Sequence, residues 1–308
     1  MSFYLAGEYT TISELKTQYI GAAQTVDDVL LLDQIREASR MIDAAAQTEF
    51  YPLIQTRVYD IPIYGGHSMT PSVPRMHPSD EMKLGGLYED QLYFDRNLCE
   101  MLTVTNGDGS VIVPANYWLV PANRYPKTAL MLKPTSGITW LLDADGNWRQ
   151  ALSINAVWGY HEDYNTYAWS ATGNALTSPI TTTATTAAYL GAGTVYAGWL
   201  GRIDAEYVYI SAVTSGTTNG TVTITRGVNG STATSHTTAA AVEHWHVNSN
   251  ISSICRRAAA SLYDLRSSKN PIEGTLQLDS ISVQTPGDVQ SWIVKQLGMN
   301  AMTHVVFA

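Results

Sequence analysis

A block of sequence with very little charge separates two segments that carry helical periodicity, and this break constrains the fold more than any other feature. Residues 161–246 contain two basic side chains against five acidic ones, while Thr, Ala and Gly dominate. Such a composition favours strands and turns over helices stabilised by ion pairs. Residues 206–213 and 221–226 have strand patterns on either side of a Thr/Asn/Gly turn, which predicts a β-hairpin. We therefore predict a small all-β domain over residues 163–246, inserted into a main domain.

The segment before the block begins with two predicted helices. Thr11 and Glu14 have the spacing of a capping box, in which each side chain bonds the other residue's backbone N–H, and the helix would end near Gly21. A longer helix is predicted to start with Thr25 as its cap and to run to about Phe50, before a proline. Apolar residues recur along it every three or four positions, at Leu31, Ile35, Ala38, Ile42 and Ala45.

Strand and turn signals replace the helical period between residues 54 and 160. A strand is predicted over residues 55–61, ending at a proline. Residues 64–86 are rich in Gly and Pro and show no periodicity, so we predict a long loop that makes functional contacts. Asn106-Gly107-Asp108-Gly109 predicts a hairpin turn, because Asn-Gly and Asp-Gly tolerate positive φ angles. Further short strands are predicted at residues 102–104, 111–113, 116–120, 129–132 and 152–158.

The helical period returns after the charge-poor block. A helix capped by Asn248, Ser249 or Asn250 is predicted from apolar residues spaced three or four apart, at Ile251, Ile254, Ala258, Leu262 and Leu265. One strand is predicted over residues 276–283. A last helix is predicted from Thr285, its cap, to Gly298, with a proline at its first position. The remaining residues, 299–308, form a short apolar tail.

The charge balance of the 308-residue chain narrows the classes of partner. Its net charge is −9, and clustered Lys and Arg are what bind phosphates, so the sequence predicts no general affinity for nucleic acid. An apolar run of about 18 residues is absent, and the N-terminus lacks the pattern of a secretory signal, so we expect no membrane partner. The two cysteines, Cys99 and Cys255, match no metal spacing and are interpreted as free buried thiols.

Candidate chemical groups in the sequence are few. His236, His244 and His246 suggest a metal site only weakly, because no neighbouring Cys or carboxylate cluster completes it. Asp108, Asp143 and Asp145 are interpreted as turn residues. Motifs for a nucleophile, a phosphate loop or a dinucleotide are missing, so we expect no catalytic residue, no metal and no cofactor. The 8 Trp and 18 Tyr against 4 Phe suit partly wet interfaces and a β-rich protein with Tyr on its exposed faces equally well, and sugar binding by stacked aromatic rings is a competing class.

The order of these parts resembles the head–tail connector (adaptor, or head-completion) proteins of tailed bacteriophages. The resemblance lies in the helix Thr11–Lys16, the helix Asp27–Asp43, Glu49–Pro52, Leu102–Gly109, Tyr117–Asn123 and Ala156–Tyr160. It covers residues 10–160 and resumes with a helix from about residue 248. The insertion resembles a module of phage proteins through Arg226–Ala233, His236 and Val242, although such modules more often have Gly where Ala240 stands.

The resemblance implies a structural protein of the virion neck, assembled in the host cytoplasm and without enzymatic activity. It implies a ring of roughly twelve subunits in head-to-tail contact between the portal protein and a tail or stopper protein. An acidic channel would let genomic DNA pass without binding it. We expect the apolar C-terminal tail to dock on the portal or on a neighbouring subunit through Met299, Met302, Val305, Val306 and Phe307.

The sequence therefore predicts an α+β fold: a small helical group with short antiparallel strands, plus the inserted all-β domain. The predicted parts are residues 1–162 and 247–308 for the connector core and residues 163–246 for the insertion. One alternative is a carbohydrate-binding or adhesin-like phage module that uses the Thr/Trp/Tyr-rich insertion as a sugar platform. Another is a hydrolase with two acids, Asp204 and Glu206, which no supporting motif accompanies.

Overall fold

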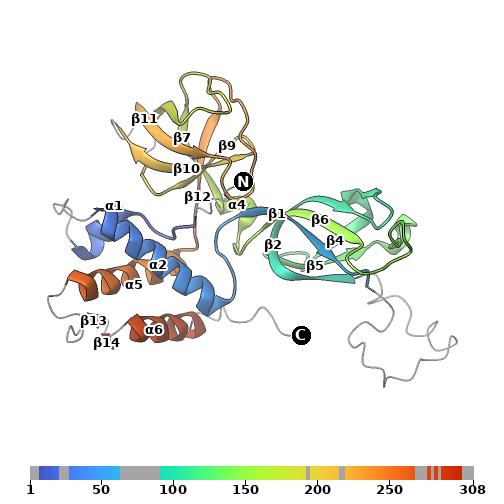
Figure 1. Ribbon diagram of the computed structural model, residues 1–308, viewed down its shortest axis with the longest axis horizontal. Coiled ribbons are helices and arrows are strands. Elements are labelled where there is room, and N and C mark those ends of the chain that lie inside the picture. Colours follow the sequence, from blue (N-terminus) through green and yellow to red (C-terminus); the bar gives the residue numbers. More distant parts are fainter. Residues whose placement is uncertain are drawn as a thin grey trace. The chain divides into compact units, whose positions relative to one another are not determined.

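The protein is α+β, with helices and antiparallel strands in two compact units (Figure 1). The computed structural model describes residues 7–20, 28–62, 91–191, 195–214, 219–267, 276–278, 281–283 and 286–299. The first unit comprises Met1–Tyr51 and Asp163–Ala308, and the second comprises Pro52–Glu162. Each unit is described by itself below.

The N-terminal helices of the first unit begin close to where the sequence places them. Helix α1 (Ile12–Leu15) has Thr11 as its N-cap and both hydrogen bonds of the predicted capping box, and it continues into a π-helical turn, η1 (Lys16–Ile20). Helix α2 (Asp28–Ala46) ends before the predicted Phe50. The reason is local: Gln47 has a φ angle of +53°, in the left-handed region where a helix stops. The predicted cap Thr25 and Gly21 lie outside the described residues.

Three helices from opposite ends of the chain pack together in this unit: α2, α5 (Ser249–Ser267) and α6 (Pro286–Met299) (Figure 1). Small side chains let α2 and α5 approach closely, and Ser39 Oγ lies 3.5 Å from Cys255 Sγ. The predicted apolar stripe of α5 is buried throughout, and that of α2 is buried except for half-buried Ala45.

The segment between α5 and α6 differs from its prediction. One strand was expected over residues 276–283, but β13 (Leu276–Leu278) and β14 (Ile281–Val283) pair antiparallel, with Leu276 opposite Val283. That prediction is therefore wrong. Asp279 and Ser280, which separate the two strands, are residue types that favour turns, and the alternating pattern concealed this break.

The charge-poor block forms a closed six-stranded barrel with strand order β10-β11-β8-β7-β12-β9. The predicted hairpin is confirmed, since β10 pairs antiparallel with β11, with Ile210 opposite Ile224. A short helix, α4 (Tyr164–Tyr167), precedes the barrel. Inward-facing aliphatic residues, among them Ile203, Val208 and Val222, fill the barrel core. The strands are β7 (Trp169–Leu176), β8 (Thr186–Gly191), β9 (Leu200–Ile203), β10 (Glu206–Val213), β11 (Asn219–Arg226) and β12 (Ala241–Trp245).

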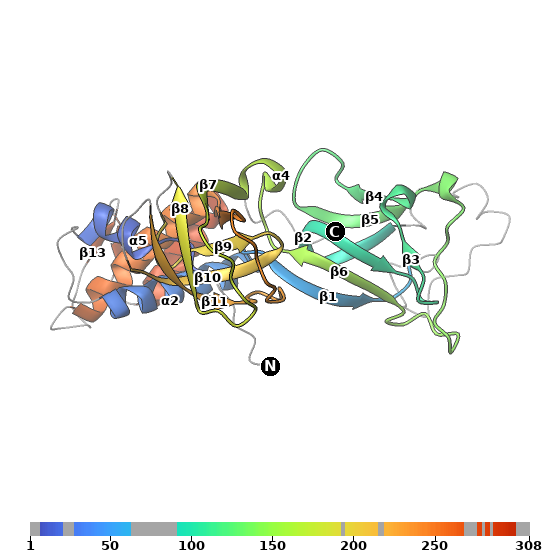
Figure 2. The same ribbon diagram turned by 90° about the horizontal axis from the view of Figure 1, so that it is seen from above.

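The second unit is an antiparallel sheet with strand order β1-β6-β2-β5-β4, in which β3 also pairs with β2 (Figure 2). Its longest strand, β2, spans fifteen residues, although the sequence indicated only residues 102–104. Three register shifts interrupt β2, so its polar and apolar side chains do not alternate regularly. The elements are β1 (Leu53–Tyr59), β2 (Gln91–Thr105), β3 (Val111–Ile112), β4 (Tyr117–Val120), β5 (Lys127–Leu132) and β6 (Leu152–Trp158), with short 3-10 turns η2 (Pro114–Asn116) and η3 (Pro134–Ser136).

The compact units divide the chain differently from the predicted ranges. Residues 1–162 were expected to form one part, but residues 1–51 belong to the unit that holds α5, α6 and the barrel, while Pro52–Glu162 form the sheet. The barrel strands lie within the range 163–246. The sheet and then the barrel therefore follow one another in the sequence between helices α2 and α5.

The close approach of α2 and α5 predicts how substitutions of alanine will affect stability. Ala258 on α5 is fully buried, so Ala258→Leu should overpack the helix contact and lower the free energy of unfolding by roughly 1–3 kcal/mol. The same substitution at Ala44, exposed on α2, should change it by less than about 0.5 kcal/mol. Urea unfolding of both variants makes the comparison, and equal effects would contradict the close packing.

Candidate functional site

The residues predicted to contact the portal cannot be placed. Met302, Val305, Val306 and Phe307 lie outside the described residues, and Met299 is the last residue of α6, with its side chain outside the description. The loop predicted over residues 64–86 also lies outside them. The proposed role of the C-terminal tail therefore stays a prediction.

The second unit exposes aromatic side chains on one face of its sheet. Cross-strand pairing places Trp118 opposite Met131 and Tyr93 opposite Ala129, so these four side chains share a face. Trp118 and Tyr93 are 47% and 51% exposed. The opposite face carries buried aliphatic residues, Leu92 and Leu130 among them. We call the face with Trp118 and Tyr93 the outer face.

Exposed apolar side chains are concentrated in this unit. Of the fourteen large hydrophobic residues that are exposed in the described part of the chain, eight belong to Pro52–Glu162. Single exposed apolar side chains are ordinary on protein surfaces, so the candidate contact is limited to those that share a face, Trp118 and Tyr93. The eight are Val58, Tyr93, Leu102, Val111, Val113, Trp118, Leu141 and Leu142.

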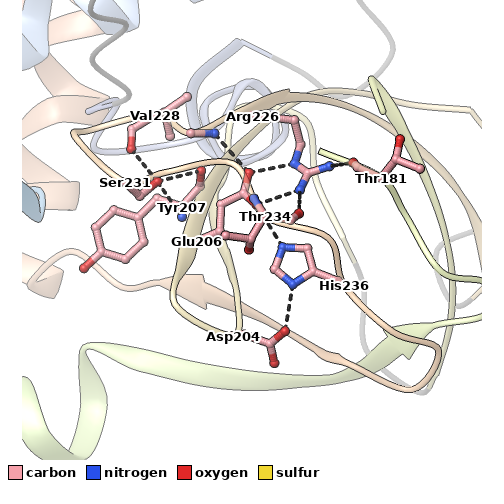
Figure 3. A network of polar contacts seen from close by, with 10 residues as sticks. Thr181, Asp204, Glu206, Tyr207, Arg226, Val228, Ser231, Thr234 and His236 are labelled. Carbon is pink, nitrogen blue, oxygen red and sulfur yellow. Dashed lines mark hydrogen bonds and ion pairs between the residues drawn. The ribbon is translucent and has the colours of Figure 1, made fainter. Parts of the chain in front are cut away.

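A buried polar network lies beside the barrel core (Figure 3). Arg226 at the end of β11 donates to both carboxylate oxygens of Glu206 on β10, with two contacts of 2.6 Å. His236 joins this pair to the β9–β10 turn: its Nε2 lies 2.9 Å from Glu206 and its Nδ1 lies 2.7 Å from Asp204. The backbone N–H of Thr234 also donates to Glu206. The side chain of Glu206 is 0% exposed and that of Arg226 is 7% exposed.

The network explains the stretch of sequence that resembles a phage module. Gly227 follows Arg226 with a φ angle of +60°, a conformation that favours glycine, and its N–H donates to Glu206. Ser231 ties the same loop to β10, because its hydroxyl accepts from the N–H of Tyr207 at 2.9 Å. These spaced polar residues thus hold one loop against the barrel (Figure 3).

The electrostatics of Glu206 bear on the hydrolase alternative. Burial by itself would raise the pKa of this carboxyl, but hydrogen bonds from Arg226, Thr234 and His236 outweigh it and hold the pKa below its usual value. The carboxylate is ionised, buried and fully occupied by protein donors. Glu206 therefore has no open path to a substrate, while Asp204, its partner in that hypothesis, is 63% exposed and bonds His236.

The other two histidines, His244 and His246, flank Ser170 at the opposite end of the barrel from the Glu206 network. Ser170 Oγ is hydrogen-bonded to His244 Nδ1 at 3.1 Å and to His246 Nε2 at 2.6 Å. The ring of His244 stacks on Trp199, with centroids 3.9 Å apart and an interplanar angle of 7°. Burial, with a smaller effect from His246, lowers the pKa of His244 to about 3. His244 is therefore neutral at ordinary pH.

A cavity of about 270 Å³ lies between the His244 end of the barrel and the start of α1. It brings together three stretches of the first unit that are distant in sequence, and carboxylates, hydroxyls, imidazoles and indoles all contribute to its wall. The lining residues are Glu8, Tyr9, Thr10, Thr11, Glu14, Gly198, Trp199, Leu200, His244, Trp245, His246, Val247 and Ser252. Sequence spacing gave no signal for it, because only the fold joins these stretches.

The predicted turn aspartates and free cysteines are confirmed. Asp108 Oδ1 accepts from the backbone N–H of Ser110 at 3.0 Å, and Asp143 Oδ1 accepts from the N–H groups of Asp145 and Asn147 at 3.0 and 2.7 Å. Cys99 and Cys255 are free and buried. These carboxylates shape turns, and the thiols pack within their units.

Comparison of the chain with protein-family models, with curated proteins and with solved structures finds no match. Among the described residues, no group of three His, Cys, Asp or Glu side chains is arranged to hold a metal ion. No helix in the described part of the chain has both the length and the apolar run needed to cross a bilayer.

The buried network predicts an unequal cost for removing two carboxylates of the barrel. Glu206→Gln leaves the buried Arg226 guanidinium without its counter-charge and should lower the free energy of unfolding by about 3–5 kcal/mol. Glu243→Gln breaks the Arg202 pair, whose side chains are each 26% exposed, and should cost about 0–1 kcal/mol. Chemical denaturation measures both, and similar costs would show that the Glu206 pair is accessible to water.

The buried imidazole predicts a loss of stability in acid. Unfolded His244 binds a proton below about pH 6.5, whereas the folded protein binds it only near pH 3, so folding weakens as the pH falls between these values. Glu206 and other carboxylates also titrate in acid, so the test compares wild type with His244→Gln, which retains a hydrogen-bonding partner for Ser170. The wild type should lose more unfolding free energy between pH 7 and pH 5 than the variant. Equal losses would contradict a neutral buried His244.

Proposed function

We propose that the protein is a head–tail connector of a tailed bacteriophage, a structural subunit of a ring between portal and tail. The outer face of the sheet is the observation that carries the proposal. A ring subunit makes heterologous contacts, so an isolated protomer exposes surfaces that its neighbours cover. Trp118 and Tyr93 on one sheet face suit such a contact, because their rings bury a large apolar area.

The packing of α2 against α5 gives a second line of support. The sequence resemblance covers residues 10–160 and resumes at about residue 248, with the insertion between. In the fold a helix from each side of the insertion meets the other: α2 packs against α5, with Ser39 Oγ 3.5 Å from Cys255 Sγ. In this proposal, α2, α5 and α6 are the helical group of the connector core, and the barrel is an added module.

The acidic balance of the chain fits the passage of DNA through such a ring. A net charge of −9 opposes binding to phosphates, so a channel made by several copies would not retain the genome. In this proposal the partners are the portal protein, a tail or stopper protein and further copies of the chain, in the neck of the virion. The contacts serve assembly, and no chemical step is assigned to the protein.

The proposal is tested by the size of the assembly in solution. Wild-type protein should form rings at high concentration, and Trp118→Asp should shift the mass towards the monomer, because it places a charge in the subunit contact. Tyr167→Asp, at a 64% exposed position on α4, adds the same charge and should leave the rings intact. Analytical ultracentrifugation distinguishes them. A wild type that stays monomeric throughout, or equal behaviour of the two variants, would refute the proposed contact.

A further inference from the structure

We propose that the cavity beside His244 binds an organic cation, an ammonium or guanidinium group carried on a flexible chain. This binding site is separate from the proposed ring contact and does not depend on it. The cavity, of about 270 Å³, lies wholly within the first unit. The charge and aromatic character of its lining residues, together with its volume, indicate which ligand it would bind.

The charge of the wall favours a cation. The residues that line the cavity include two carboxylates, Glu8 and Glu14, and neither Lys nor Arg. His244, also in the wall, is neutral because burial lowers its pKa.

Glu14 is the more exposed of the two carboxylates in the wall. Glu8 is 5% exposed and already accepts from Arg36 at 2.9 Å and from the Tyr209 hydroxyl at 3.2 Å. Glu14 directs one oxygen, Oε2, to the cap of α1, where it accepts from the N–H of Thr11 at 3.1 Å. Its other oxygen, Oε1, makes a long ion pair of 3.6 Å with Arg256 Nη1, and the side chain is 48% exposed, so a bound cation would share this oxygen with Arg256.

The remainder of the wall is aromatic and hydroxylic. The Trp199 indole is held by its stack on His244 and by an edge contact with Tyr196 at 5.2 Å, so it forms a rigid surface. Indole and phenol rings attract cations through their negative faces. The hydroxyls of Thr10 and Ser252 line the cavity and offer acceptors to the N–H groups of a cation.

The dimensions of the cavity suit a small ligand. A volume of about 270 Å³ lies just below the range of roughly 300–1,000 Å³ for drug-sized ligands, which suits one side chain or a short amine. The same cationic group could come from a free polyamine or from a Lys or Arg side chain of a protein, and the test separates these sources.

The experiment titrates spermidine, N-acetyl-arginine amide and maltose into the full chain by isothermal calorimetry at fixed ionic strength. Glu14→Gln removes the charge and retains the capping box, which accepts Gln at this position, so the fold is preserved. We expect the wild type to bind a cation and Glu14→Gln to bind it about tenfold more weakly, as for a lost charge-assisted hydrogen bond. Glu162→Gln, an exposed residue outside the cavity wall, changes the net charge equally and should bind as the wild type does.

The outcomes separate the possible ligands. Preference for spermidine identifies a free amine as the ligand, and preference for the arginine amide identifies a basic side chain. The proposal is overturned if neither cation binds, if Glu14→Gln binds like the wild type, if both Gln variants weaken binding equally, or if maltose alone binds. Ring formation is measured separately, so failure here leaves the proposed function standing.

Discussion

The architecture depends on the contact between α2 and α5. These helices lie more than 200 residues apart in sequence, yet Ser39 and Cys255 touch across them because alanines and serines permit a close approach. Ordering so distant a contact costs chain entropy, which the buried Leu31, Ile35 and Ile254 offset by removing apolar surface from water. Between these two helices the chain forms first the sheet of the second unit and then the barrel of the first.

The sequence predicted those helices and strands that are determined by neighbouring residues. The capping box at Thr11, the α5 stripe and the barrel hairpin follow from capping and periodicity, and each is confirmed. The early end of α2 at a left-handed Gln47 and the register shifts of β2 are backbone irregularities that interrupt a pattern, so periodicity did not reveal them. The cavity was missed because residues 8–14, 198–200 and 244–252 converge only in the folded unit.

The barrel shows where the few charged side chains of residues 161–246 are used. Glu206, Arg226 and His236 are three of its few ionisable groups, and all three are buried in one network. These charged groups hold the loop after β11 against the barrel. Each of them has hydrogen-bonding partners that offset the hydration it loses on burial. At the other end of the barrel, Trp199 and His244 form a neutral stack that lines the same cavity as Glu14, so the barrel presents a rigid wall to this cavity.

The central claim is that copies of this chain assemble into a ring that joins a portal. In this proposal the exposed Trp118 face supplies the subunit contact, and the acidic balance of the chain keeps the passage from binding DNA. Negative-stain electron microscopy of the purified protein, alone and mixed with the portal protein of the same virion, tests the claim most directly. We predict ring-shaped particles with rotational symmetry that seat on the portal. Single protomers under both conditions, with the portal left bare, would contradict it.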